Sequence, residues 1–377
     1  MRHVLVTVLA VSTVAVPVRV QESFYSHDNY TQYELLAPDS HQFAITYYVT
    51  ERRVGAVHLL NQTRSGSEGS DISVFDPATG KPLRFDYMTG AELTANGTPG
   101  RFDPAEHYIR AHLPRPVPEG GEGRVKILKT YKDEKSYYAE GDEIVFKRSL
   151  GIARNAIVLP KGFRLASSNV AAQIFTLPDG RLKISFEHAH GYAADVTIRA
   201  RRFNTGSTPT EAPVSLERAF DWSKALYDVR LEPPLITVTR EYIETGAGAE
   251  VTLERPPGLS GEFTVTDVDS GQPLDVLRRG QQVVVRLTTP LRGPGGSARL
   301  RITGPMQGVN VARRGESSVF DLTINSARGV VLLPAGWDVV SVSVPATVGT
   351  QRDGRVGIQI YNGASGALSV TIAAAKR

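Results

Sequence analysis

The residues best placed to do chemistry in this sequence are two histidines, His188 and His190, separated by a single alanine. Alternate residues of a β-strand point to the same face of a sheet, so the two imidazoles could share a metal ion. Two ligands hold a metal weakly, and a third would have to come from His58, His107 or His112. The simpler interpretation is a pair of solvated histidines at the end of a strand.

The common catalytic signatures are missing from the sequence. It has no His-Glu-x-x-His, no Gly-x-x-x-x-Gly-Lys-Ser/Thr loop, no Gly-x-Gly-x-x-Gly between a strand and a helix, and no Gly-x-Ser-x-Gly elbow. The chain also contains no cysteine, which excludes disulfides, thiolate zinc sites and iron–sulfur clusters. We therefore expect a protein that is not an enzyme and that carries no cofactor.

Aromatic residues gather at three places where they could contact a partner, because protein interfaces favour Tyr and Trp. Tyr137 and Tyr138 lie in the charged segment 129–142, and Phe220, Trp222 and Tyr227 lie on or beside one stripe of a predicted helix. Packing into a core is the alternative for both groups. The same choice applies to the aromatic residues that crowd the first segment: Phe24, Tyr25, Tyr30, Tyr33, Phe43, Tyr47 and Tyr48.

The elements that must position these residues are short β-strands. Runs of alternating or β-branched residues are separated by Gly, Pro, Asp and Asn, which is typical of an antiparallel β-sandwich. Asp179-Gly180 and Asp353-Gly354 are hairpin dipeptides, since both residue types tolerate a positive φ. Strands are predicted near 43–49, 72–75, 108–113, 125–128, 156–159, 182–186 and 196–200, with a similar series from 235 to 373.

An internal repeat organises the chain. Residues 145–200 align without gaps to 319–374, and 72–83 align to 263–274. We expect two tandem β-sandwich-like domains, copy one at 21–202 and copy two at 230–377. Between them, 203–229 is predicted to be a Gly/Ser/Thr/Pro-rich linker followed by a short helix over 215–228, capped by Ser215.

The first twenty residues have the features of an export signal. Arg2 and His3 precede an apolar stretch at 4–18, which as a helix spans only ~22 Å of a ~30 Å hydrocarbon core. Cleavage is the first expectation, but the small-residue rule is met only tolerably near Ala15, so an uncleaved anchor in the inner membrane is the alternative. Either fate places the protein in the periplasm or outside the cell.

Copy one, over about 31–202, resembles the N-terminal β-sandwich domain that precedes the catalytic domain in bacterial M1-type metallopeptidases. The resemblance rests on Tyr108-Ile-Arg-Ala-His-Leu-Pro, Gly151-Ile-Ala-Arg-Asn155, Leu159-Pro160-Lys-Gly162 and the Asp179-Gly180-Arg181 hairpin. The catalytic helices and zinc ligands of that family have no equivalent in the sequence. The resemblance implies a module that supports or contacts something else, and it carries over no functional residue.

These observations favour a non-catalytic exported scaffold that binds other proteins. An uncleaved N-terminus would make it an accessory subunit of a membrane complex, respiratory or photosynthetic, with residues 4–18 in contact with the membrane. The first alternative is an extracytoplasmic module that binds a sugar or a metal, and the second is a hydrolase with an unrecognised site. The net charge of +4 is small for 377 residues, and a nucleic-acid partner is not expected.

Overall fold

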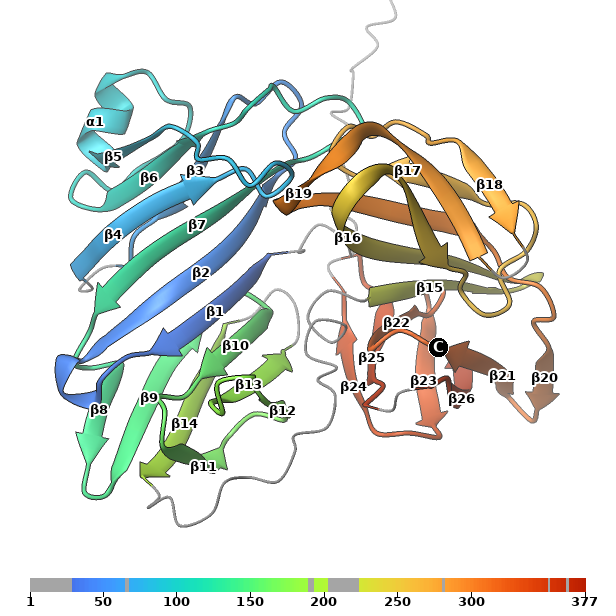
Figure 1. Ribbon diagram of the computed structural model, residues 1–377. Helices are drawn as coiled ribbons and strands as arrows, with labels where there is room; N and C mark the ends of the chain where they lie inside the picture. The colour runs from blue at the N-terminus through green and yellow to red at the C-terminus, as the bar shows by residue number, and fades with distance from the viewer. Residues whose placement is uncertain are drawn as a thin grey trace, which may run out of the picture.

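The computed structural model describes residues 29–64, 68–188, 193–202, 224–279, 282–351, 353–363 and 366–377. These residues are nearly all β-strand, which confirms the all-β class predicted from the sequence. They form two sets of sheets, coloured blue to green and yellow to red in Figure 1. No helix in the described residues is long and apolar enough to cross a membrane, and the apolar stretch 4–18 lies outside them.

Copy one contains three sheets. A seven-stranded sheet, in the order β12-β13-β10-β1-β2-β7-β4, packs on a four-stranded sheet, β11-β14-β9-β8, and a smaller sheet, β3-β6-β5, adjoins them. A short helix follows β5. The elements are β1 (Tyr30–Leu35), a 3-10 turn (Pro38–Ser40), β2 (Gln42–Glu51), β3 (His58–Gln62), β4 (Glu68–Phe75), β5 (Phe85–Thr89), α1 (Gly90–Ala95), β6 (His107–His112), β7 (Gly123–Lys132), β8 (Tyr137–Glu140), β9 (Glu143–Leu150), β10 (Arg154–Val158), β11 (Phe163–Ser168), β12 (Gln173–Thr176), β13 (Leu182–Glu187) and β14 (Ala194–Arg202).

Copy two has the same order with longer strands. Its large sheet runs β17-β19-β16-β15-β22-β25-β24, with β18 also paired to β19, and its second sheet runs β20-β21-β26-β23. The elements are β15 (Lys224–Leu231), β16 (Pro234–Glu254), β17 (Thr264–Asp267), β18 (Val276–Arg279), β19 (Gln282–Pro305), β20 (Val311–Arg314), β21 (Ser317–Ile324), β22 (Arg328–Leu332), β23 (Trp337–Val342), β24 (Ala346–Thr350), β25 (Val356–Tyr361) and β26 (Leu368–Lys376).

Strands in the two copies correspond at the spacing of the sequence repeat. The central strand β10 begins at Arg154 and β22 begins at Arg328, and each pairs in parallel with the first strand of its own copy. Both central strands are buried at every position, as expected for strands that are covered on both faces of a sheet. The repeat seen in the sequence is thus a repeat of strand order and pairing.

The helix predicted over 215–228 does not extend to its expected end. Residues 224–228 open strand β15 instead, paired to β16 and β22, and the remainder of the predicted helix lies outside the described residues. Leu226 and Tyr227 fit a helical stripe, but Tyr227 also alternates with Ala225 and Val229 on the inward face of a strand. Pairing with two neighbouring strands outweighs a helical preference of a few tenths of a kcal/mol per residue.

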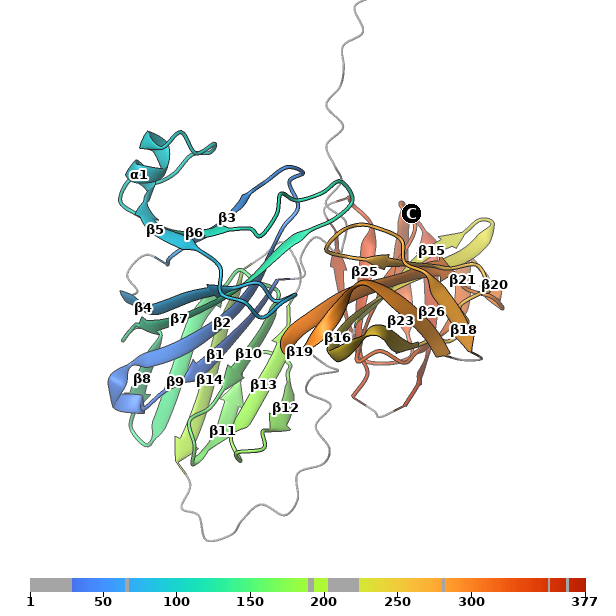
Figure 2. The same cartoon turned by 45° about the horizontal axis from the view of Figure 1, so that its top comes forward.

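The two copies lie side by side in both views (Figures 1 and 2), and they meet through segments that are equivalent in the repeat. The backbone N–H of Glu122 donates to the carbonyl of Asp269 at 3.2 Å, and that of Ser297 donates to the carbonyl of Ala78 at 3.1 Å. The repeat aligns Glu122 with Ser297 and Ala78 with Asp269, so each bond is the equivalent of the other. Reciprocal contacts of this kind define a self-complementary interface.

Ion pairs reinforce the same interface. Arg299 of copy two donates to Glu122 of copy one at 2.9 Å, and Arg328 of copy two donates to Glu187 of copy one at 2.6 Å. Asp269, of the same copy as Arg299, accepts from it at 2.5 Å and helps to hold it in place. The hydroxyl of Tyr361 donates to the carbonyl of Glu187, its own equivalent in the repeat, at 2.9 Å. Because these charges are buried and paired, losing one partner would leave the other uncompensated. The copies are therefore held together by specific contacts.

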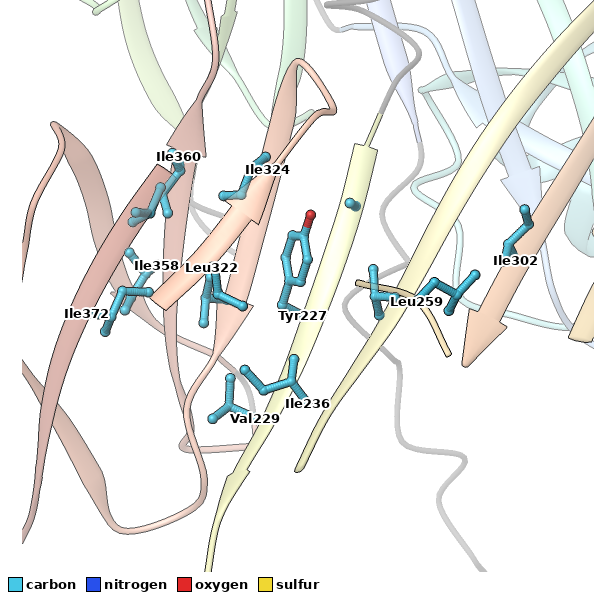
Figure 3. Close-up of a cluster of buried hydrophobic side chains, with 14 of the residues drawn as sticks. Tyr227, Val229, Ile236, Leu259, Ile302, Leu322, Ile324, Ile358, Ile360 and Ile372 are labelled. Atoms are coloured by element: carbon cyan, nitrogen blue, oxygen red, sulfur yellow. The ribbon is translucent and has the colours of Figure 1, made fainter. Parts of the chain in front are cut away.

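The interiors of the two copies differ. Copy two has one continuous hydrophobic core that joins both of its sheets, part of which is drawn in Figure 3. Copy one has two separate clusters, one between its large sheet and its four-stranded sheet and the other between its large sheet and the small sheet.

Candidate functional site

An open cavity of about 460 Å³ lies in copy one, lined by residues of the cluster between its large and four-stranded sheets and by Tyr47, which packs against both clusters. Its size is in the range of small-molecule sites. The lining residues come from β1, β2, the end of β3, β7 and β9: Thr31, Tyr33, Ile45, Tyr47, Asn61, Gln62, Thr63, Arg64, Lys129, Tyr131, Arg148, Ser149, Leu150, Gly151 and Ile152. Three cations and three phenols are among them, and no carboxylate or imidazole is.

Lys129 occupies an inward-facing position of β7, between the apolar Ile127 and Tyr131. It is 6% exposed, and its Nζ donates to Oδ1 of Asn61 at 2.8 Å. The ammonium also lies 4.9 Å from the centre of the Tyr131 ring, within range of a cation–π interaction. Burial, with a smaller contribution from the nearby Arg148, lowers the pKa of Lys129 to about 8.

Arg148 reaches the cavity from the opposite sheet, on the inward face of β9. Its Nη1 donates to Oδ2 of Asp133 at 2.9 Å and to Oγ of Ser136 at 3.1 Å. The guanidinium lies 5.3 Å from the ring centre of Phe43 and 5.5 Å from that of Tyr131. Burial lowers the pKa of Arg148, but an arginine stays charged over the whole physiological range.

Tyrosines form much of the remaining wall. Burial raises the pKa of Tyr33, Tyr47 and Tyr131, so all three are neutral phenols at physiological pH. The Tyr131 hydroxyl accepts a hydrogen bond from the backbone N–H of Arg64 at 3.2 Å. Arg64 itself is exposed at the cavity, and its Nη1 donates to the carbonyl of Ser149 at 3.0 Å, which links the end of β3 to β9.

The charge of the cavity is positive. Asp133 balances Arg148, whereas Lys129 has no ion pair with any carboxylate whose side chain the structure describes. A buried ammonium without a counter-ion raises the free energy of the folded state by several kcal/mol before compensation. An anionic group bound between Lys129 and Arg148 would remove that cost, so the arrangement favours a negatively charged ligand.

Copy two shows that the fold does not need these charges. The inward position of Arg148 in β9 is equivalent to that of Leu322 in β21, which is 3% exposed and part of the continuous core (Figure 3). Lys129 has a glycine, Gly304, as its equivalent in copy two. The strand pairing shows this, because the row of directly paired residues in copy one is Ile157, Tyr33, Ile45 and Lys129, and the row in copy two is Val331, Tyr227, Val238 and Gly304.

The place of the cavity is filled in copy two. A Cβ added to Gly304 would lie 2.7 Å from Cβ of Phe263 and 3.0 Å from Cδ1 of Leu259, so this segment closes over the glycine. Copy two does bury one arginine nearby, Arg240, and its Nη1 donates to Oδ1 of Asn325 at 2.7 Å. The cationic cavity is therefore a property of copy one alone within this comparison.

The residues predicted from the sequence lie elsewhere. His188 is half-buried, with its Nε2 2.7 Å from the carbonyl oxygen of Ile152, and His190 lies outside the described residues, so their shared metal stays a prediction. No group of three or more metal-ligating side chains converges within the described residues. His58 and His112 contact each other on the small sheet.

The aromatic contact residues are mostly inside the protein or outside the described segments. Tyr137 is fully buried and its hydroxyl donates to the carbonyl of Leu36 at 2.9 Å, and Tyr227 is 1% exposed in the core of copy two. Both are packing residues here, in place of the partner contacts expected for them. Tyr138 is half-buried, and Phe220 and Trp222 lie outside the described residues.

Sequence reasoning missed Lys129 and Arg148. Arg148 leaves a usable signal in the sequence, because the repeat aligns this arginine with Leu322 at an inward position of a strand. Lys129 leaves none, because it lies outside both aligned stretches of the repeat and in the charged segment 129–142. The structure places Lys129 within β7, where strand pairing turns its side chain inward.

Comparisons with known proteins assign this chain to no family. No family model matches this chain, and no curated protein is similar to it at the level searched. Among solved structures, a mutant of a two-domain M1 zinc metallopeptidase bound to L-tryptophan matches with a TM-score of 0.30 and 11% identity. The match covers 46% of this chain and 41% of that one. The matched protein is of the metallopeptidase family that copy one resembles in sequence.

Proposed function

We propose that this chain is a non-catalytic binding protein whose copy one takes a small organic anion in the cavity around Lys129 and Arg148. One observation carries the proposal: two inward positions hold cations in copy one and hold Gly304 and Leu322 in copy two. A charge buried at a cost that the fold does not require is retained for a ligand more readily than for stability. Export, expected from residues 4–18, places this binding outside the cytoplasm.

The ligand class follows from the lining. Lys129 and Arg148 would hold a carboxylate or phosphate, and the phenols of Tyr33, Tyr47 and Tyr131 offer flat apolar faces with polar edges. The volume suits a molecule the size of an acidic monosaccharide. This deepens the sugar-binding alternative raised by the sequence, and we favour it over a scaffold that binds only proteins.

The lining also favours binding over hydrolysis. Hydrolases that act on sugars and esters use paired carboxylates or an imidazole as acid and base. None of the residues that line this cavity is Asp, Glu or His. The absence of catalytic activity remains part of the proposal and is measured in the same experiment, by following the ligand for turnover.

The test is calorimetric titration of the full chain with glucuronate, galacturonate and inorganic phosphate, with glucose as the neutral control. Arg148→Leu copies the residue found in copy two and is expected to weaken binding of the acidic ligands at least tenfold. Lys147→Met removes one charge from the outward, exposed face of the same strand and should leave binding unchanged. Equal binding by wild type and Arg148→Leu, or no binding of any anion by wild type, would overturn the proposal.

A further inference from the structure

A second constellation lies on the small sheet of copy one, away from the cavity. His58 on β3 is directly opposite His112 on β6 in the strand register. Nε2 of His58 and Nδ1 of His112 are 3.2 Å apart, with the ring planes at 81° and the ring centres 4.6 Å apart. Both side chains are half-buried at the protein surface, so solvent ions can reach them.

A carboxylate orients the second histidine. Oδ2 of Asp86, on β5, lies 2.8 Å from Nε2 of His112 and also accepts from Arg110 at 2.7 Å. A carboxylate oxygen accepts hydrogen bonds, so Asp86 keeps the proton of His112 on Nε2. This leaves the lone pair of Nδ1 directed toward His58.

We propose that His58 and His112 form a two-nitrogen site for a late first-row divalent cation, Zn²⁺ or Cu²⁺. At metal–nitrogen bonds of about 2.0–2.1 Å, two nitrogens 3.2 Å apart subtend an angle of about 100° at the metal. That angle lies between the square-planar and tetrahedral values that Cu²⁺ and Zn²⁺ adopt. His58 joins by moving its proton from Nε2 to Nδ1 through solvent, so both nitrogens present lone pairs.

The carboxylate that orients one of the two ligands is already in place. Histidine ligands in metalloproteins commonly donate their other N–H to a carboxylate, and His112 already has Asp86 in that position. No third protein ligand converges here within the described residues, so water would fill the remaining positions. The site is therefore suited to reversible binding in place of a permanent structural metal.

Copy two again shows that the fold does not need the pair. The residues at the equivalent cross-strand positions are Glu250 and Arg286, whose side chains form an exposed ion pair at 3.5 Å. The equivalent of Asp86 is Leu277, an exposed apolar residue. Copy two thus has an ordinary exposed ion pair at these positions, whereas copy one has two imidazoles in contact and a carboxylate hydrogen-bonded to one of them.

The test is titration of the untagged full chain with ZnCl₂ by calorimetry and with CuSO₄ by electron paramagnetic resonance. Wild type is expected to bind one ion at this site with coupling to two nitrogens. His58→Gln and His112→Gln should each weaken binding at least tenfold and leave coupling to one nitrogen at most. Circular dichroism checks that each variant is folded.

Two further variants separate this site from the alternatives. The double variant His188→Ala/His190→Ala removes the pair predicted from the sequence and should leave the binding at His58 and His112 unchanged. Asp86→Asn should weaken zinc binding about tenfold while keeping coupling to two nitrogens, which a loss of structure would not keep. Unchanged binding in both His58→Gln and His112→Gln, or loss of all binding in His188→Ala/His190→Ala, overturns the proposal.

Discussion

Copy one and copy two share their strand order, their parallel central pair and their turns, yet they fill their interiors in opposite ways. Copy two joins its sheets through one apolar core, with Leu259 closed over Gly304 and with Leu322 inside. Copy one places Lys129 between its two clusters, with Ile127 on one side and Tyr131 on the other, and buries Arg148 in the larger cluster. The difference teaches that the fold does not require cations at these two positions, which Gly304 and Leu322 occupy in copy two.

The largest effect is expected from giving copy two the cation of copy one. Leu322→Arg places a guanidinium in a closed core that has no equivalent of Asp133 facing that position. It should lower the free energy of unfolding of copy two by about 4 kcal/mol or more. Urea unfolding followed by circular dichroism measures this, and a loss below about 1 kcal/mol would show that the two interiors are interchangeable.

Removing the unbalanced charge of Lys129 from copy one should raise the free energy of unfolding, which is the opposite of the change expected for Leu322→Arg. The folded-state pKa of Lys129 is about 8, below its usual value of 10.5, so the unfolded chain holds this proton more tightly. The charge therefore destabilises the fold fully below pH 8, and that penalty disappears as the pH rises toward 10.5. Lys129→Met should stabilise the protein by about 2–3 kcal/mol at pH 7, while abolishing anion binding.

The pH dependence of that gain is the control. The difference in unfolding free energy between Lys129→Met and wild type should shrink steadily between pH 8 and pH 10.5. Lys147→Met, on the outward face of β9, should show a difference within about 0.5 kcal/mol at every pH. A destabilised Lys129→Met at pH 7 would contradict the assignment of an uncompensated charge.

The smallest effect concerns the interface, where the copies are nearly equivalent. A Cβ on Gly121 would lie 2.7 Å from the carbonyl oxygen of Asp269, whereas one on Gly296 would lie 3.3 Å from that of Ala78. Gly121→Ala should therefore cost about 1–2 kcal/mol and Gly296→Ala less than about 0.5 kcal/mol. Hydrogen exchange of the Glu122 and Ser297 amides reports the opening, and equal effects would contradict the contact geometry.

The parts of this architecture that could be predicted from the sequence are those with a periodic signal. Inward alternation in segments such as 43–49 and 182–186 gives the strands, and the offset of 174 residues gives the equivalence of β10 with β22. The helix predicted for 224–228 is wrong, because the spacing of the apolar residues there fits both a helix and a strand. Only the pairing with β16 and β22 decides between the two.

The cavity could not be predicted because it depends on register between distant strands. Lys129 and Arg148 are 19 positions apart in sequence, on different sheets, and nothing local says that both side chains point inward. The pair formed by His58 and His112 is a similar case, since only the pairing of β3 with β6 brings the two rings together. A difference in residue type between the two copies at equivalent inward positions is the sequence signal that comes nearest to indicating such sites.

The most direct measurement of the central claim is the titration of Lys129 itself. Nuclear magnetic resonance of ¹³C-labelled lysine, assigned with Lys129→Met, follows its Cε signal with pH in the free protein and with saturating glucuronate. The account predicts a midpoint near pH 8 in the free protein and a clear upward shift when the anion is bound. A midpoint near 10.5 that the anion does not move would contradict it.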